Sequence, residues 1–136
     1  MNRRLTDTPL VAIVDDDDAI RAAMDKLARS LGLSTCTFAS AESFLQSSFI
    51  PKTRCLILDV QMPSMSGLEL QERLASLGLK MPIIFITAYP DEEVKARALR
   101  AGAVGFFHKP LELNGQAIVD CLYAALETSN GARPAS

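Results

Sequence analysis

The chain has 136 residues, a formal net charge of −2, and a hydrophobic content of 49%. This length suits one domain with a proper core, and the charge gives no basis for nucleic-acid binding through a basic face. No apolar run approaches the roughly 20 residues of a membrane helix, and the polar start of the chain lacks the pattern of a signal peptide. We therefore expect a cytoplasmic globular protein with no membrane contact.

Apolar runs alternate with amphipathic stretches along the chain, which indicates repeated strand–helix units. In chain order, the pattern predicts a strand at 10–14, a helix at about 17–31, a strand at 34–38, a short helix capped by Ser40, a strand at 55–59, a helix at about 67–77, a strand at 83–87, a helix at about 90–101, a strand at about 104–108 and a helix at about 112–127. Cys36, Cys55 and Cys121 fall in these elements and are expected to be reduced core thiols.

The predicted fold class is α/β, a three-layer sandwich around a five-stranded parallel sheet. Continuous apolar runs are typical of parallel strands, which are covered on both faces. Right-handed crossovers and the polar, edge-like strand at 34–38 favour the flavodoxin-like strand order 2-1-3-4-5. We expect one domain over residues 10–127, with residues 1–9 and the tail 128–136 disordered.

Polar residues stand at the carboxyl end of four of the predicted strands or directly after it. They are Asp15 and Asp16 after the first strand, Asp59 at the end of the third, Thr87 at the end of the fourth and Lys109 after the fifth. Ligands of an open parallel sheet bind outside the carboxyl ends of its strands. We therefore expect these side chains to meet in one crevice, where they suit a divalent cation and a phosphoryl group.

The acidic run 15–18 has two readings. Asp17 and Asp18 are explained as residues of a helix N-terminus, where acidic side chains cap amides and complement the dipole. Asp15 and Asp16 lie at the strand end instead, where they would repel one another unless a cation compensates. Mg²⁺ is the natural candidate because it prefers oxygen ligands and needs only one or two carboxylates beside a phosphate.

Asp59, Thr87 and Lys109 also have ordinary explanations. An Asp that closes a strand is often a turn residue, Thr is common in strands, and Lys is usually a solvated charge. Beside the acidic pair, however, Asp59 becomes a candidate nucleophile, since carboxylates can form aspartyl phosphates. Thr87 could then donate to a phosphoryl oxygen, and Lys109 could offset the added charge.

Four motifs in this order and spacing resemble the receiver domain of two-component response regulators. They are IVDDDDAIR, CLILDVQMPSMSGLEL, FITAY and AGAVGFFHKP. The likeness covers Leu10 to Glu127, and within this range the sequence most resembles the receivers of nitrogen-fixation-type regulators and their stand-alone relatives.

The resemblance implies roles for individual residues. Asp59 would be the phosphoacceptor, and Asp15 and Asp16 would hold Mg²⁺. Asp16, Asp59 and the main-chain carbonyl of Gln61 would be direct metal ligands.

Thr87 and Lys109 would bind the phosphoryl oxygens, and Phe106 would be the switch aromatic that follows Thr87. Family members often carry Tyr at the position of Phe106, so a signal carried by that hydroxyl is absent here. His108 is expected at the surface, without an assigned role.

The resemblance also implies partners. A sensor histidine kinase or a phosphotransfer protein would supply the phosphoryl group. Phosphorylation would then reshape the face made by the predicted helix at about 90–101, the predicted strand at about 104–108 and the predicted helix at about 112–127, which would form a homodimer or dock a target. The domain would be no enzyme beyond its own phosphorylation and dephosphorylation. We favour a stand-alone receiver over a domain excised from a longer regulator.

Three alternatives remain at this point. Asp15 to Asp17 satisfies the D-x-D spacing of dehalogenase-type phosphatases, in which Asp15 would be the nucleophile and Asp59 would have no purpose. A flavodoxin-like binding module shares the strand order, but the acidic run would repel a flavin phosphate. A non-phosphorylated pseudo-receiver that only binds other proteins would not need Asp59, Thr87 and Lys109 together.

Overall fold

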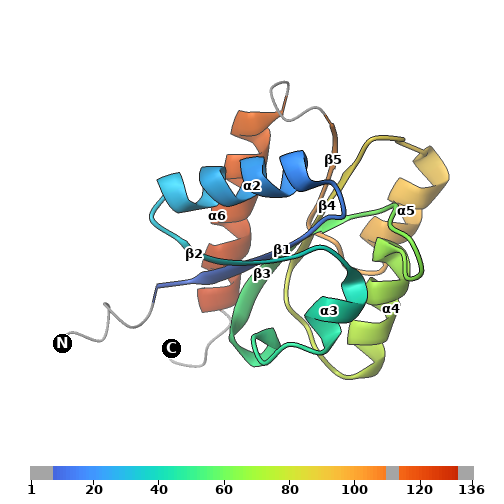
Figure 1. Ribbon diagram of the computed structural model, residues 1–136, viewed down its shortest axis with the longest axis horizontal. Coiled ribbons are helices and arrows are strands. Elements are labelled where there is room, and N and C mark those ends of the chain that lie inside the picture. Colours follow the sequence, from blue (N-terminus) through green and yellow to red (C-terminus); the bar gives the residue numbers. More distant parts are fainter. Residues whose placement is uncertain (1–7, 110–113, 132–136) are drawn as a thin grey trace.

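The computed structural model describes residues 8–109 and 114–131 and has one parallel sheet of five strands in the order β2-β1-β3-β4-β5 (Figure 1). The strands are β1 (Leu10–Val14), β2 (Ser34–Phe38), β3 (Thr53–Asp59), β4 (Ile83–Thr87) and β5 (Gly105–His108). Every neighbouring pair is parallel. The predicted fold class and strand order are thereby confirmed, with β2 at an edge of the sheet.

Helices cover both faces of the sheet. They are α2 (Asp18–Ser30), α3 (Ala41–Leu45), α4 (Gly67–Ser76), α5 (Glu92–Arg100) and α6 (Gly115–Gly131), with a 3-10 helix η1 (Ile50–Lys52) before β3. In Figure 1, α2 and α6 lie together on one side of the sheet, and α3, α4 and α5 lie on the other. Among the described residues, none of the helices is both long and apolar enough to cross a membrane.

Each central strand contributes side chains to two separate cores. In β3, Leu56 and Leu58 pack with residues of α3 and α4, whereas Cys55 and Ile57 pack with residues of α2 and α6. Successive strand side chains point to opposite faces, so a strand buried on both faces needs an unbroken apolar run. The central strands are therefore predictable from continuous apolar runs, without an alternation of polar and apolar residues.

The helices begin and end where capping rules place them. Asp17 caps α2 by accepting from the backbone N–H groups of Ala19 and Ile20, which confirms its assignment to the helix N-terminus. Ser66 and Glu69 form a capping box at the start of α4. Gly78 follows α4 with a φ of 77°, a left-handed conformation that glycine adopts without strain.

The end of helix α6 and the presence of helix η1 differ from the prediction. Helix α6 continues to Gly131, past the predicted end at Glu127, so assigning residues 128–131 to a disordered tail was wrong. The polar composition of residues 128–130 favours a disordered tail, but polar side chains do not stop a helix, whereas glycine commonly does. The predicted start of α6, and the predicted disorder of 1–7 and 132–136, lie outside the described residues. Helix η1 carried no recognised sequence signal.

Candidate functional site

The predicted site residues converge at the carboxyl end of the sheet. Asp59 and Thr87 are the last residues of β3 and β4, and Asp15 and Lys109 directly follow β1 and β5. The parallel register places these strand ends at one edge, with Asp59 paired to Ile86 in the neighbouring strand. The crevice expected from the sequence is therefore present.

Three carboxylates form a cluster in this crevice. One oxygen from each of Asp15, Asp16 and Asp59 lies within 4.8 Å of the others. Asp15 is 0% exposed and Asp59 is 3% exposed, while Asp16 is exposed. Burial removes the water that would otherwise screen the charges of Asp15 and Asp59, so the repulsion between these two carboxylates is strong.

The two oxygens of Asp15 have different surroundings. Oδ1 accepts a hydrogen bond of 2.8 Å from the backbone N–H of Asp17. Oδ2 is buried and has no hydrogen-bond partner, although the ammonium of Lys109 lies 3.2 Å away. A buried polar atom without a hydrogen-bond partner calls for an explanation such as a bound ion.

The pKa of Asp59 reflects this crowding. Burial, followed by the negative charge of Asp15, raises the pKa of Asp59 to about 7, and the positive charge of Lys109 opposes the rise. Among the described residues, the Lys109 ammonium contacts two of the three carboxylates, those of Asp15 and Asp59. A divalent cation would supply the missing positive charge, and the carboxylate oxygens are the donors that Mg²⁺ prefers. The residues present therefore fit a magnesium site.

Lys109 reaches both buried carboxylates. Its Nζ lies 3.2 Å from Oδ2 of Asp15 and 3.6 Å from Oδ1 of Asp59. Its backbone N–H donates to the carbonyl oxygen of Thr87 at 2.8 Å, which fixes the start of the lysine side chain against β4. The ammonium is therefore close enough to either carboxylate to bind a group added to one of them.

Thr87 is fully buried, and its hydroxyl makes two hydrogen bonds. It donates to Oε1 of Gln61 at 2.9 Å and accepts from the backbone N–H of Tyr89 at 3.1 Å. The sequence analysis named Gln61 only for its main-chain carbonyl. Its side-chain contact with Thr87 was missed, because nothing in the sequence signals where an exposed loop glutamine points.

Arg21 was also missed. Its guanidinium donates to the main-chain carbonyl of Asp15 at 2.8 Å and to Oδ1 of Asp18 at 2.6 Å. The side chain therefore ties helix α2 to the loop that carries the acidic pair. An arginine near the start of a helix is ordinary, so the sequence alone carries no sign of this contact.

Gly67 sets the distance between α4 and β3. A Cβ atom at this position would clash with the main-chain carbonyl oxygen of Asp59 and would crowd the ring of Phe85. The backbone N–H of Gly67 donates to the carbonyl of Val60 at 2.9 Å. The absence of a side chain here therefore lets the loop after β3 fold tightly beneath the acidic cluster.

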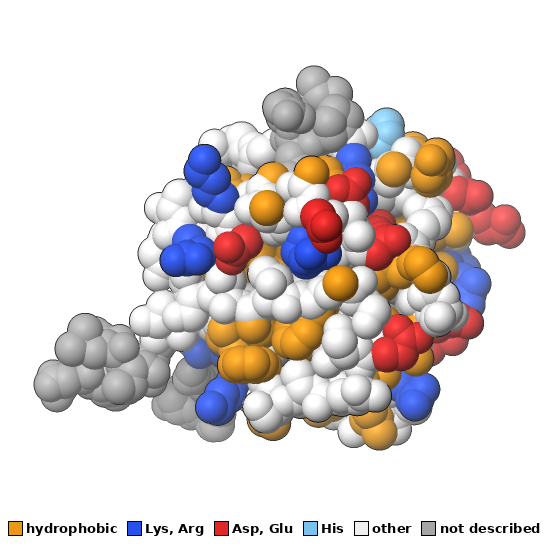
Figure 2. Space-filling view, in the orientation of Figure 1, with side chains coloured by type: hydrophobic (Ala, Val, Ile, Leu, Met, Phe, Trp, Pro, Cys, Tyr) orange, Lys and Arg blue, Asp and Glu red, His pale blue; other side chains and the backbone are white. Residues whose placement is uncertain are grey.

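Phe106 and His108 lie on β5, which is next to β4. Phe106 is half-buried, and its ring centroid lies 6.1 Å from that of Phe85. His108 is exposed, and the histidine side chain is visible at the surface in Figure 2. The surface position expected for His108 is thereby confirmed.

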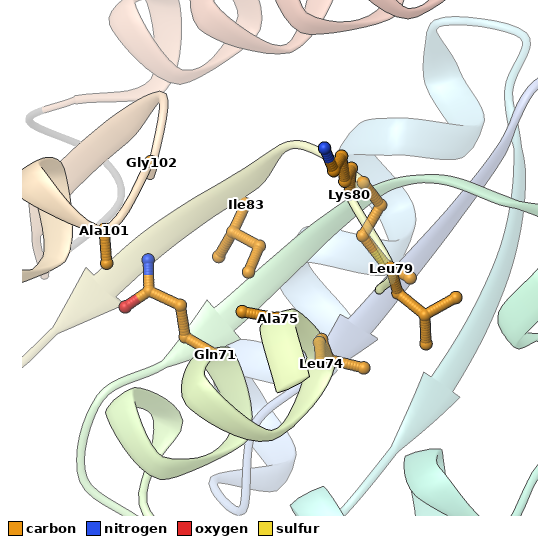
Figure 3. A pocket seen from close by; sticks show the side chains of 9 residues that line it. Gln71, Leu74, Ala75, Leu79, Lys80, Ile83, Ala101 and Gly102 are labelled. Carbon is orange, nitrogen blue, oxygen red and sulfur yellow. The ribbon is translucent and has the colours of Figure 1, made fainter. Parts of the chain in front are cut away.

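A cavity of about 330 Å³ lies away from this site, at the opposite ends of the strands (Figure 3). Its wall includes Ile83, the first residue of β4, together with apolar residues of α4 such as Leu74. The Gln71 amide points toward the Ala101 side of the cavity and donates to the carbonyl of Ala98 at 3.1 Å. None of the predicted site residues lines it.

A surface hollow of about 470 Å³ adjoins the acidic site. It is formed along the loop between β3 and α4, and its lining includes Gln61 and Met62. The loop that follows Asp59 thus borders an open surface hollow.

Comparison with known proteins identifies the family of the chain. The family model of the response regulator receiver domain matches residues 11–119. Nodulation protein W of Bradyrhizobium diazoefficiens is 41% identical over 126 residues, which cover 93% of this chain and 55% of that protein. The chain thus spans about half the length of the curated relatives it matches.

Solved structures show the same fold. The response regulator StyR superposes with a TM-score of 0.84 at 41% identity, covering 94% of this chain and 64% of that chain. The crystal structure of FixJ-N gives a TM-score of 0.76 at 36% identity, covering 88% of this chain and 94% of that chain.

Proposed function

The chain belongs to the response regulator receiver domain family of two-component systems, and we propose that it accepts a phosphoryl group on Asp59. The donor would be the phosphohistidine of a sensor histidine kinase or a phosphotransfer protein. A carboxylate oxygen of Asp59 would form the new bond to phosphorus, while the bond from phosphorus to the imidazole nitrogen breaks and its electrons stay on the histidine. Beyond this transfer and the hydrolysis of the aspartyl phosphate by water, which releases inorganic phosphate and regenerates the Asp59 carboxylate, we propose no enzymatic activity. We place the domain in the cytoplasm, with its donor.

The observation that carries the proposal is the contact of one lysine with two buried carboxylates that differ in their surroundings. Asp15 is wholly buried and its Oδ1 is held by the backbone N–H of Asp17. Asp59 ends the central strand β3 within 3.6 Å of the Lys109 ammonium. Asp15 is therefore suited to hold charge in place and Asp59 to react, which also argues against a phosphatase that uses Asp15 as its nucleophile.

The acidic cluster would hold Mg²⁺. Asp16, Asp59 and the main-chain carbonyl of Gln61 would be direct ligands, and Asp15 would complete the negatively charged surroundings of the ion. When bound, Mg²⁺ would neutralise charge on the phosphoryl oxygens during an in-line displacement. The chain itself would supply the positioned carboxylate, the Thr87 hydroxyl and the Lys109 ammonium.

Phosphorylation would then change the charge and the contacts of the site. A phosphoryl group adds negative charge and strong acceptor oxygens, to which Thr87 can donate and with which Lys109 can pair. Movement of Thr87 toward that group would shift the loop between β4 and α5, and Phe106 would turn inward behind it. Phosphorylation would in this way favour one of two arrangements of the loop between β4 and α5 and of Phe106.

The surface that would respond is made by α5, β5 and α6. Large hydrophobic side chains are exposed on α5, just before β5 and on α6: Leu99 is 42% exposed, Val104 is 47% exposed and Tyr123 is 49% exposed. A contiguous exposed apolar patch marks a protein interface, and these three side chains are the large apolar groups that this face offers to one. We propose that this face forms a homodimer or docks a target protein when Asp59 is phosphorylated.

Intact mass spectrometry after incubation with acetyl phosphate tests the proposal. One labile phosphate per chain is expected in the presence of Mg²⁺, and none with EDTA or in Asp59→Asn. If the wild-type protein gains no phosphate and also fails to bind beryllofluoride, a pseudo-receiver that acts only through protein contacts is favoured instead.

A further inference from the structure

We propose that the side chain of Gln61 is a positioning residue that holds the Thr87 hydroxyl in the unphosphorylated protein and releases it when Asp59 is phosphorylated. This inference rests on the proposed function of Asp59. It concerns the amide of Gln61 and is separate from the metal-binding role proposed for the carbonyl of the same residue.

The hydrogen bond between the two side chains joins two loops of the site. Gln61 lies in the loop after β3, two residues beyond Asp59, and Thr87 ends β4. The Thr87 hydroxyl donates to Oε1 of Gln61 at 2.9 Å. The loop that carries the phosphoacceptor is therefore tied directly to the strand end that would respond to phosphorylation.

The contact with Gln61 competes with any contact to a phosphoryl group. A threonine hydroxyl has a single proton to donate, and in this structure it is directed to Gln61. Thr87 is 0% exposed, so its hydroxyl is not free to exchange Gln61 for bulk water. To donate to a phosphoryl oxygen, Thr87 must give up its bond to Gln61.

Breaking the hydrogen bond between Thr87 and Gln61 costs little free energy, because the two residues differ in exposure. Gln61 lies at the surface, so its amide regains hydrogen bonds to water when Thr87 leaves. The net effect of exchanging one neutral hydrogen bond is small, and its loss corresponds to about a threefold to tenfold change in an equilibrium constant. The hydrogen bond to Gln61 thus opposes the movement of Thr87 by a small free energy and does not prevent it.

Tyr89 provides a reporter of the released state. Its backbone N–H donates to the Thr87 hydroxyl at 3.1 Å, so rotation of that hydroxyl changes the environment of the Tyr89 amide. Substitution of Gln61 should therefore alter the Tyr89 amide resonance even without any phosphoryl group.

The test compares wild type with Gln61→Met, which keeps the main-chain carbonyl and a side chain of similar length but removes the acceptor. Beryllofluoride with Mg²⁺ serves as the phosphoryl mimic, and calorimetry measures its affinity. We expect Gln61→Met to bind it about threefold to tenfold more tightly. Gln46→Met, at an exposed glutamine after α3, is the matched control and should leave the affinity unchanged.

A second comparison isolates the hydrogen bond from other effects at Gln61. In the free protein, ¹⁵N NMR should show that Gln61→Met shifts the Tyr89 amide in the wild-type and Thr87→Ser backgrounds, where a hydroxyl is present. The same substitution should have no further effect on that amide in Thr87→Val.

The outcomes separate this inference from the proposal on which it rests. If wild type does not bind beryllofluoride, the proposed function fails and the inference falls with it. If wild type binds but Gln61→Met has equal or weaker affinity, only the role of Gln61 is overturned. A Tyr89 shift that persists in Thr87→Val overturns it as well, since the effect would not pass through the hydroxyl.

Discussion

The ammonium of Lys109 lies 3.2 Å from Oδ2 of Asp15, a buried carboxylate oxygen that has no hydrogen-bond partner. The same ammonium lies 3.6 Å from Asp59. Lys109 therefore offsets part of the charge of the acidic cluster in this structure, and under the proposed function it would also bind the phosphoryl group added to Asp59. Both roles lead to measurable consequences.

Removal of the lysine charge should destabilise the protein. We expect Lys109→Met to lower the free energy of unfolding by about 2–4 kcal/mol at pH 8 in EDTA, because it leaves buried carboxylates without their cation. Urea unfolding monitored by circular dichroism measures this. Mg²⁺ should reduce the loss by supplying positive charge to the same carboxylates. The exposed Lys95 on α5 provides the control Lys95→Met, and an equal loss in that variant would contradict the assignment.

The raised pKa of Asp59 predicts an unusual dependence of stability on pH. Because its pKa is about 7 in the folded protein, against an ordinary value of 3.8, the folded state binds more protons than the unfolded state between these values. The contribution of Asp59 therefore makes the protein less stable as pH rises through this window. In EDTA, Asp59→Asn should be more stable than wild type by about 2–4 kcal/mol at pH 8.

The difference between the two proteins should shrink as pH falls from about 8 toward 4, since Asp59 becomes protonated and loses its unfavourable charge. Unfolding curves at several pH values, each recorded for both proteins, give this difference directly. A gap that stays constant with pH would show that Asp59 titrates at its ordinary value and that the charge of Asp15 does not act on it.

Gly67 should not tolerate a side chain. We expect Gly67→Ala to lower the free energy of unfolding by about 1–3 kcal/mol, because its Cβ would overlap the carbonyl oxygen of Asp59. It should also slow phosphorylation by acetyl phosphate, since the loop that carries the site must move. Gly115→Ala, where a Cβ would meet nothing within 4 Å, is the control and should show neither effect.

The sequence predicted the acidic site well because its parts obey rules that do not depend on side-chain detail. Parallel strands show as unbroken apolar runs, and the residues that follow them must gather at one edge of the sheet. Asp15, Asp59 and Lys109 came together for this reason. The capping role of Asp17 was predictable because it depends only on neighbouring backbone.

The contacts that the sequence did not predict depend on tertiary geometry. Nothing in the sequence directs the Gln61 amide to Thr87, since the two residues are brought together only when β3 and β4 pair. The guanidinium of Arg21 donates to the carbonyl of Asp15, a contact that depends on how the chain turns between β1 and α2. The end of α6 was missed because polar residues 128–130 permit a helix without requiring one.

Mapping the phosphorylated residue tests the central claim most directly. After incubation with acetyl phosphate and Mg²⁺, borohydride reduction converts an aspartyl phosphate into homoserine, and peptide mass spectrometry then locates it. The account predicts homoserine at position 59 alone, with none formed in Asp59→Asn. Homoserine at position 15 or 16 would contradict it, because the nucleophile would then be one of the residues that we assign to holding Mg²⁺.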